Sequence, residues 1–295
     1  RATFASLIRI GHAVATLGAS PFTVDRKLLH GGLRKALAGA PPADVARALQ
    51  DRIEEAVLRF AEVAVRHPGA GTTAPTRLAC SGGLFANVRL APRLASLDGV
   101  TRVDVCPAMS DEGLALGAAL AASGCIADEA CDTVAWGPAI TPETAARALE
   151  RSALHVLASD RERSLDLAAD ALAAGAVVAL ADGRLEFGPR ALGQRSLLFD
   201  ARKTALAPHV SRALGRPAHM PFAPATLADE AQHCYAELDG LSATARFMTA
   251  ALDTSAAFRA AFPLAVHVDG SARAQLVTAS SAPTLHALLL RFRER

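Results

Sequence analysis

Several residue types that characterise common protein classes are scarce in this chain. Aromatic residues make up only 4% of the 295 residues, which leaves few rings on which nucleic acid bases can stack. No apolar window of about 18 residues is free of charge, so the sequence predicts no membrane span. The five cysteines form no C-x-x-C pair. They predict no zinc site and indicate reduced thiols in a cytoplasmic protein.

Signatures of common enzyme classes are missing as well. The sequence has no G-x-x-x-x-G-K-S/T, H-E-x-x-H or G-x-S-x-G motif, each of which carries a defined chemistry. Residues 69–74 read G-x-G-x-x-A, but they follow His67-Pro68 instead of a strand, so the context of a dinucleotide site is lacking. Lysine is scarce too. Of 31 basic residues only Lys27, Lys35 and Lys203 are lysines, so arginine is the main cation.

Arginine is concentrated in residues 183–198, where Arg184, Arg190 and Arg195 occur with Glu186 and three glycines. The preceding apolar run, residues 176–180, has the length and composition of a buried strand. Arginine presents paired donors to phosphate or carboxylate oxygens, and glycine lets the backbone approach a ligand closely. We interpret the segment as an oxyanion site at a sheet edge. The alternative is a solvated loop in an arginine-rich protein.

The charge around this segment is unbalanced, although the chain as a whole carries only +2. Residues 184–216 contain seven cations and two acids. The cations are Arg184, Arg190, Arg195, Arg202, Lys203, Arg212 and Arg216, and the acids are Glu186 and Asp200. A local excess inside a balanced chain indicates a small anionic ligand more than a nucleic acid surface.

The first 140 residues show an α/β pattern. Glycine and proline interrupt residues 1–42, where we expect helices joined by loops. Helical spacing of apolar residues over 43–66 predicts a long amphipathic helix. The pattern then predicts a linker at 68–76, a strand ending at Cys80, a glycine turn, a helix to Arg93, a strand at 101–106 and an alanine-rich helix at 114–122.

The rest of the chain shows an α+β pattern with a mixed sheet. Residues 124–141 have the composition of a connector, and Thr141 and Pro142 predict the start of a helix. Further helices are expected at 164–174 and 284–293, and strands at 176–180, 265–268 and 274–277.

Three smaller motifs have both a functional and a structural interpretation. Gly82-Gly83, with Asn87 nearby, enters a helix whose free amides suit phosphate oxygens, but a plain tight turn explains the glycines equally well. Asp111 follows a strand and is either the N-cap of the next helix, which the residues alone favour, or a metal ligand. His267-x-Asp269 followed by Arg273 suits the protonation of a phosphate leaving group, or forms a strand-edge ion pair.

Five blocks in a fixed order make the chain similar to the carbamoyltransferase family that includes the NodU, CmcH and aminoglycoside O-carbamoyltransferases. The most specific block is Leu185-Glu186-Phe187-Gly188-Pro189-Arg190-Ala191-Leu192-Gly193-x-Arg195-Ser196. The other blocks are Gly82-Gly83-x-x-x-Asn87, Pro107-Ala108-x-x-Asp111-x-Gly113-x-Ala115-Leu116-Gly117-Ala118-Ala119, Pro221-Phe222-Ala223-Pro224 and His267-Val268-Asp269-Gly270-Ser271-Ala272-Arg273-x-Gln275.

The resemblance implies two active centres. Residues 1–140 resemble part of an actin/Hsp70-like (ASKHA) carbamoyl-transfer domain, and residues 141–295 resemble a YrdC-like α+β domain that is C-terminally incomplete. In such enzymes the YrdC-like domain forms a carbamoyl-adenylate from carbamoyl phosphate and ATP. The other domain passes the carbamoyl group to a hydroxyl of a small acceptor, such as an antibiotic, a sugar or a nodulation factor. Neither a membrane nor a nucleic acid partner is expected.

Residue roles follow from the resemblance by position. Arg190, Arg195, His267 and Arg273 are assigned to catalysis on phosphate and carbamoyl oxygens. Gly82, Gly83, Asn87, Arg184, Glu186, Ser196, Arg216 and Asp269 are assigned to nucleotide and phosphate binding. Asp111 is assigned to a divalent metal, iron or magnesium, in the full-length protein.

The chain also departs from the family pattern. The H-x-x-x-H pair expected to complete the metal site is absent, and Leu214 and Met220 occupy positions that are usually basic. Because the sequence begins at Arg1, we interpret it as the C-terminal piece of a carbamoyltransferase. Three alternatives stay open: a kinase-like ATP-dependent protein, a nucleotide- or RNA-binding YrdC-like module, and an inactive truncated remnant.

Overall fold

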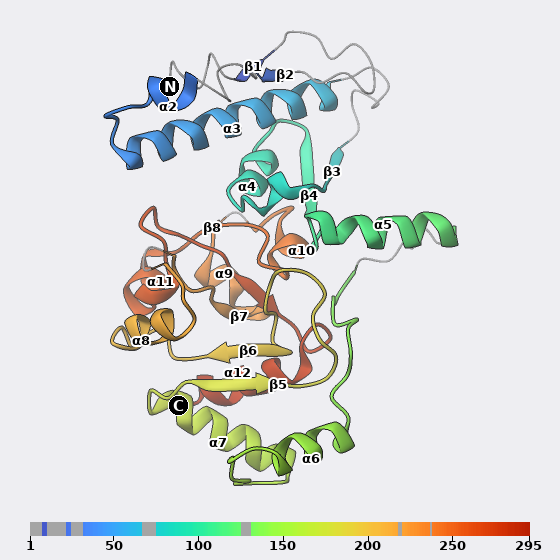
Figure 1. Cartoon of the computed structure of the whole chain (residues 1–295), viewed down its shortest axis with the longest axis vertical. Coiled ribbons are helices and arrows are strands. Elements are labelled where there is room, and N and C mark those ends of the chain that lie inside the picture. Colours follow the sequence, from blue (N-terminus) through green and yellow to red (C-terminus); the bar gives the residue numbers. More distant parts are fainter. Residues whose placement is uncertain are drawn as a thin grey trace. The chain divides into compact units, whose positions relative to one another are not determined.

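The computed structural model describes residues 8–10, 22–24, 32–66, 75–124, 131–217, 220–236 and 238–295. The chain divides into two compact units (Figure 1). Unit 1 contains Arg1–Leu78 and Pro92–Val103, and unit 2 contains Ala79–Ala91 and Asp104–Arg295. The division into two family domains at residue 140 stays a prediction. Both units mix helices and strands, in agreement with the predicted α/β and α+β character.

Unit 1 is built on one long helix, α3 (Pro42–Val65), which begins directly after Pro41. Proline suits the first helical position because an N–H group there has no partner within the helix. Ala56, Val57 and Ala61 are buried on one face of α3, as the amphipathic pattern requires. The helix predicted over residues 43–66 is confirmed.

The other elements of unit 1 are short. β1 (Ile8–Ile10) pairs with β2 (Phe22–Val24) in antiparallel fashion, and α2 (Leu33–Ala36) follows. The expectation of helices over residues 1–42 is therefore wrong at β1 and β2. The remaining residues before 32, and most of the linker expected at 68–76, lie outside the described residues.

Three elements contain residues of both units. They are β3 (Thr76–Cys80), α4 (Leu90–Ala95) and β4 (Val100–Val105), and β3 pairs with β4. Both predicted strands are confirmed. The single helix expected up to Arg93 is wrong, because a 3-10 helix (Gly83–Ala86) ends at the extended Asn87 before α4 begins.

Two helices of unit 2, α5 and α6, lie where the sequence predicts helices. α5 (Asp111–Ser123) ends at Gly124, whose φ is +63°, and it includes the predicted alanine-rich helix. α6 (Pro142–Glu150) begins after Thr141, whose Oγ1 accepts a hydrogen bond from the Thr144 N–H, while the Thr144 Oγ1 accepts one from the Thr141 N–H. The predicted start at Thr141 is confirmed, because this reciprocal pair satisfies two amides that have no partner within the helix.

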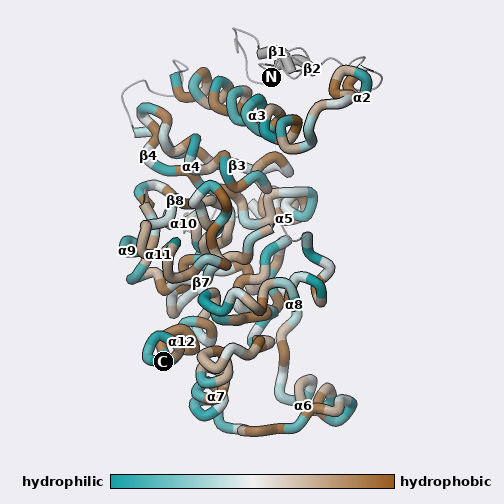
Figure 2. The backbone as a smooth tube through the Cα atoms, turned by 90° about the vertical axis from the view of Figure 1, so that its left-hand side faces the viewer, coloured by the Kyte–Doolittle hydropathy of each residue, from teal (hydrophilic) through white to brown (hydrophobic). Residues whose placement is uncertain are grey.

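A helix pair supports the hairpin that carries the arginine segment. α7 (Arg161–Ala173) and α12 (Pro283–Arg293) lie side by side (Figures 1 and 2). β5 (Val178–Ala181) and β6 (Arg195–Leu198) are antiparallel, and side chains of both strands pack on the helix pair. The predicted helices at 164–174 and 284–293 and the strand at 176–180 are confirmed. The packed side chains include Leu165, Leu172, Leu288, Val178 and Leu198.

Unit 2 also contains further α-helices and strands among its described residues. They are α8 (Leu206–Ala213), β7 (Ala225–Leu227), α9 (Ala231–Cys234), α10 (Ser242–Ala245), β8 (Leu252–Asp253), α11 (Ala256–Ala261), β9 (Ser271–Ala272) and β10 (Gln275–Val277). β7 is parallel to β10, and β8 is antiparallel to β9.

Of the two strands expected in residues 265–277, one is correct. β10 confirms the strand at 274–277. The strand at 265–268 is wrong, because Ala265 is the last residue of a 3-10 helix (Pro263–Ala265) and Val268 lies in a turn. None of the helices in the described part of the chain is long and apolar enough to cross a membrane.

Candidate functional site

A cavity of about 640 Å³ lies within unit 2, and five arginines line it. Arg202 and Arg293 form ion pairs with two acids that also line the cavity, Asp200 and Glu230. The other three, Arg190, Arg216 and Arg273, come from different segments of the chain. Arg190 lies in the loop between β5 and β6, Arg216 follows α8, and Arg273 lies between β9 and β10. The structure thus brings Arg190, Arg216 and Arg273 to one cavity, although the first and the last are 83 positions apart in the sequence.

The three guanidinium groups influence one another. Burial, together with the charges of Arg190 and Arg216, lowers the pKa of Arg273 to about 10. Burial also lowers the pKa of Arg190. The Nε atoms of Arg190 and Arg273 are buried, and neither has a hydrogen-bond partner among the described residues. Buried donors without a partner are costly, so this wall of the cavity is suited to an anion that accepts hydrogen bonds.

Arg216 is held at the cavity by contacts with two residues that follow it in the chain. Its Nη2 donates to the backbone carbonyl of Pro221 at 3.0 Å. Its guanidinium carbon lies 4.6 Å from the centre of the Phe222 ring. The Phe222 ring in turn meets Phe199 edge to face, with ring centres 4.7 Å apart. A cation over an aromatic face is attracted to it, so Phe222 helps to fix Arg216 at the cavity.

The rest of the cavity is mainly apolar. Its walls include Leu198, Leu227, Phe258 and Leu285, and Ser196 adds a hydroxyl. The Ser196 Oγ accepts a hydrogen bond from the Gly193 N–H at 2.9 Å. Small-molecule sites commonly combine apolar walls with a few polar groups that orient the ligand. The arrangement is suited to a ligand with an anionic group and a less polar body.

Arg195 and Arg184, two other arginines of the predicted site, are engaged by the backbone. The Nη1 of Arg195 donates to the carbonyls of Asp182 and Gln194, both at 2.7 Å. The Nη2 of Arg184 donates to the carbonyl of Trp136 at 2.6 Å. Neither arginine is among the described residues that line the cavity. The structure therefore does not bring Arg184 and Arg195 together with the other three.

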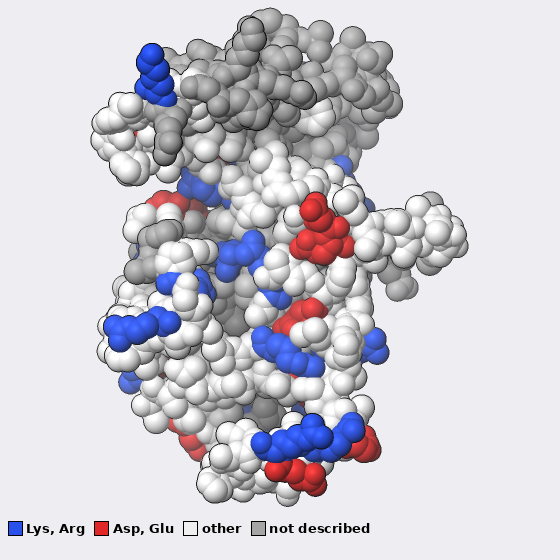
Figure 3. Space-filling model, in the orientation of Figure 1, with Lys and Arg blue, Asp and Glu red and all other residues white. Residues whose placement is uncertain are grey.

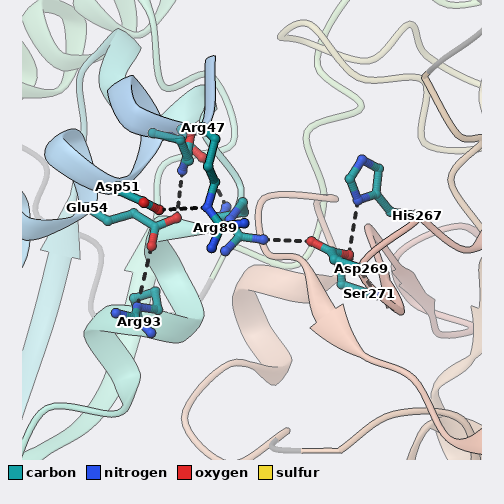
Figure 4. Close-up of polar contacts among 10 residues, drawn as sticks. Arg47, Asp51, Glu54, Arg89, Arg93, His267, Asp269 and Ser271 are labelled. Atoms are coloured by element: carbon teal, nitrogen blue, oxygen red, sulfur yellow. Dashed lines mark hydrogen bonds and ion pairs between the residues drawn. The ribbon is translucent and has the colours of Figure 1, made fainter. Parts of the chain in front are cut away.

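The predicted His267 and Asp269 form a separate polar cluster (Figure 4). The Nδ1 of His267 lies 3.0 Å from Oδ1 of Asp269, and Ser271 donates to the same oxygen. Arg89 donates to the other oxygen, Oδ2, at 2.6 Å. Although partial burial opposes ionisation, the bonds from Ser271 and His267 lower the pKa of Asp269 to about 2. His267 and Asp269 are not among the described cavity-lining residues, whereas Arg273 of the same motif is.

The Gly82-Gly83 motif forms a turn. Gly82 has a φ of +109°, which favours glycine, and its N–H donates to the carbonyl of Met109 at 2.7 Å. Gly83 begins the 3-10 helix that precedes Asn87, and the Asn87 Oδ1 accepts a hydrogen bond from the Arg89 N–H at 3.3 Å. None of these residues lines the cavity described above.

Asp111 is the first residue of α5, and Ser110 occupies the N-cap position. The N-cap interpretation of Asp111 is therefore wrong by one residue. A carboxylate in the first turn still interacts favourably with the helix dipole. Within the described residues, no group of three or more histidine, cysteine or acidic side chains is placed to hold a metal ion.

Two residues of functional interest had no role assigned from the sequence. Arg89 contacts Asp269 across 180 positions, and no local sequence signal reveals such a distant pair. Phe222 belongs to the Pro-Phe-Ala-Pro block, so its motif was visible, but its contact with Arg216 was not. On the face shown in Figure 3, basic and acidic side chains are interspersed. This distribution suits a small anionic ligand more than a long polyanion.

Comparison with known proteins relates this unit to one family. Residues 169–295, which include Arg190, Arg216 and Arg273, match the family model described as "Carbamoyltransferase C-terminus". The chain is 34% identical over 262 residues to Nodulation protein NolO of Bradyrhizobium diazoefficiens, an alignment covering 85% of this chain and 46% of that protein.

Two further relatives have similar coverage. The chain is 36% identical over 236 residues to 3'-hydroxymethylcephem-O-carbamoyltransferase of Streptomyces clavuligerus, covering 78% of this chain and 41% of that protein. It is 30% identical over 267 residues to Nodulation protein U of Azorhizobium caulinodans, an alignment covering 87% of this chain and 43% of that protein. The chain thus spans less than half the length of these curated relatives.

Proposed function

The chain belongs to the carbamoyltransferase family, whose C-terminal domain it carries over residues 169–295, and we propose that its cavity binds carbamoyl phosphate and ATP. In this proposal, unit 2 forms a carbamoyl-adenylate, and the carbamoyl group then passes to a hydroxyl of a small-molecule acceptor. The curated relative from Streptomyces clavuligerus is named as an O-carbamoyltransferase, which supports a hydroxyl acceptor here.

One observation carries the proposal: two buried arginines at one cavity each retain an Nε donor without a partner among the described residues. A phosphate presents several acceptor oxygens to such donors at once. Arg216 lies close enough to Arg273 to lower the pKa of that side chain. Two or more negative charges from phosphate groups would offset this repulsion, and the apolar walls would contact the uncharged part of the ligand.

The reaction balances in three steps. Carbamoyl phosphate gives its phosphoryl group to water and leaves carbamate and inorganic phosphate. A carbamate oxygen then bonds the α-phosphorus of ATP, and pyrophosphate leaves. Finally the acceptor hydroxyl oxygen bonds the carbamoyl carbon, loses its proton, and AMP leaves. Arginines placed around the phosphates stabilise the charge that develops in these steps, which is consistent with the absence of a nucleophilic triad motif from the sequence.

The finer domain assignment is part of the same proposal. We assign the cavity-bearing part to a YrdC-like domain and the N-terminal part to an actin/Hsp70-like domain, with acceptors of the antibiotic, sugar or nodulation-factor type. The metal expected at Asp111 does not fit the described residues, because one exposed carboxylate at a helix start is no ligand set. No step is therefore assigned to a metal.

The test is exchange of labelled pyrophosphate into ATP by the 295-residue chain, with and without carbamoyl phosphate. We expect exchange only when carbamoyl phosphate is present. Arg190→Ala should lower the exchange rate by about 100-fold, because removing one charged donor from such a site typically costs a few kcal/mol of transition-state stabilisation.

The matched control is Arg212→Ala, which removes an exposed arginine in the last turn of α8 and should leave the rate unchanged. Exchange without carbamoyl phosphate, or no exchange at all by the unmodified chain, would overturn the proposal. Tight, strongly salt-dependent RNA binding in place of exchange would favour the RNA-binding alternative.

A further inference from the structure

The loop that carries Arg190 is organised around one buried carboxylate. Glu186 is only 8% exposed. Its Oε1 accepts hydrogen bonds from the backbone N–H groups of Leu192, Gln194 and Arg195 at 2.8, 2.9 and 3.0 Å. These three bonds close residues 186–195 into a compact turn, named here the Glu186 loop. Arg190 lies within the loop, between the carboxylate and the amides that bind it.

A second set of contacts fixes the end of the Glu186 loop that follows Arg190. Leu192 is buried in a core cluster with Phe247, and its carbonyl accepts a hydrogen bond from Nε2 of Gln275 at 2.8 Å. Gly193 has a φ of +101°, and a Cβ added there would lie 2.7 Å from Leu285. The backbone after Arg190 is therefore held in one place, and the Glu186 carboxylate connects it to the backbone before Arg190.

Glu186 itself is not among the described residues that line the cavity. Pro189, Arg190, Ala191 and Ser196 do line it. The sequence had assigned Glu186 to ligand binding. Its Oε1 already accepts three backbone bonds, which leaves that oxygen little capacity for a further donor.

The negative charge of Glu186 strengthens these bonds. Hydrogen bonds from N–H groups to an ionised carboxylate are about twice as strong as neutral ones. Although burial opposes ionisation, the backbone donors of Arg195, Leu192 and Gln194 hold the pKa of Glu186 below the ordinary value of 4.5. The carboxylate is thus ionised near neutral pH, where the loop has to present Arg190.

We propose that Glu186 is a positioning residue for Arg190: it binds no ligand, and by accepting three backbone N–H bonds it holds the loop in the shape that directs the guanidinium into the cavity. The inference rests on the proposed phosphate-binding function of that cavity. In this proposal Glu186 organises the backbone of the loop. A change at Glu186 should therefore affect ligand binding only when Arg190 is present.

A double-mutant cycle tests this dependence, with carbamoyl phosphate as the probe and isothermal titration calorimetry as the measurement. Glu186→Gln keeps the shape and one acceptor oxygen but removes the charge. We expect it to weaken binding by about tenfold in the unmodified background, within the range of couplings between interacting residues. In the Arg190→Ala background the same change should have almost no effect, because the side chain that Glu186 positions is gone.

The controls separate positioning from a general loss of structure. Glu150→Gln, at the exposed end of α6, should leave binding unchanged in both backgrounds. A Glu186→Gln effect of equal size with and without Arg190 would overturn the inference, since a general packing defect acts independently of Arg190. Unchanged binding in Glu186→Gln would overturn it as well.

A second measurement uses the unmodified chain and needs neither ligand nor variant. In an NMR titration, the amide protons of Leu192, Gln194 and Arg195 should shift together with one midpoint below 4.5, because all three donate to the same carboxylate. Separate midpoints, or no titration, would disprove the Glu186 contacts. Failure of carbamoyl phosphate to bind would instead count against the proposed function, while this titration still tests the loop.

Discussion

At the scale of single residues, Arg273 lowers the stability of the unliganded protein and favours the binding of an anion in the cavity. Its guanidinium is largely buried, and burial and two neighbouring arginines lower its pKa to about 10. Like charges in an apolar surrounding repel each other and lose hydration, so the unliganded protein pays a free-energy penalty there. An anion that accepts hydrogen bonds from the buried Nε atoms removes the penalty, which links affinity to this local instability.

Arg273→Met should therefore stabilise the unliganded protein. Methionine fills a similar volume without charge, and replacing a poorly compensated buried charge by an apolar side chain can raise the free energy of unfolding by about 1 kcal/mol. Urea denaturation measures this change. The same variant should lose the stabilisation that added pyrophosphate gives the unmodified chain. Arg212→Met, at an exposed position on α8, is the control. A destabilised Arg273→Met that still responds to pyrophosphate would contradict the argument.

At the scale of elements, the sequence predicted those structures whose signals are local. α3 begins at a proline, and α6 begins after a threonine that caps its first turn. Both helices lie where the sequence pattern predicts them. β6 and β7 were not predicted. Each has only three or four residues. β6 pairs with β5 across the arginine loop, and β7 pairs with β10, which lies 50 positions further along the chain. Short strands of this kind carry too few side chains to show a period in the sequence.

The Glu186 loop depends at one point on close packing against α12, and Gly193→Ala tests that contact. At a φ of +101° an alanine is strained, and its Cβ would lie 2.7 Å from Leu285 and 3.5 Å from Ala282. We expect a loss of about 2–4 kcal/mol in the free energy of unfolding, from strain and overpacking together. Gly215→Ala is a matched control, because its φ of +61° is also positive but its Cβ would meet nothing within 4 Å. It should cost only about 1 kcal/mol. Equal losses would show that the contact with Leu285 is unimportant.

At the scale of the whole chain, composition indicated an anionic ligand but not which arginines meet at the cavity. Arg190, Arg195 and Arg216 all belong to the cation-rich stretch of residues 184–216. Arg195 lies opposite Ala181 in the β5–β6 register, and its guanidinium binds backbone carbonyls. Arg190 and Arg216, with Arg273 from a later segment, line the cavity. Which arginines reach the cavity depends on contacts between segments that are far apart in the chain. The family resemblance identified the candidate arginines but did not show which of them line the cavity.

The scaffold and the cavity of unit 2 should be separable by mutation, and Leu165→Ala provides the test. Leu165 on α7 is 5% exposed, packs in the core with α12, and is not among the described cavity-lining residues. Removing its side chain should lower the free energy of unfolding by about 2–5 kcal/mol. The fluorescence of Trp136, the single tryptophan of the chain, reports unfolding of unit 2 in urea. Carbamoyl phosphate affinity, measured well below the unfolding midpoint, should stay unchanged, because the arginines keep their loops.

Leu154→Ala is the control for this test, since Leu154 is 71% exposed and its loss should change stability by no more than about 0.5 kcal/mol. The helix α12 already forms part of the cavity wall through Leu285. If Leu165→Ala instead weakened ligand binding in proportion to its loss of stability, the core packing of α7 against α12 would also determine the position of the arginines. The two readouts together decide whether the position of the arginines depends on the local loops, as the Glu186 contacts imply, or on the packing of unit 2 as a whole.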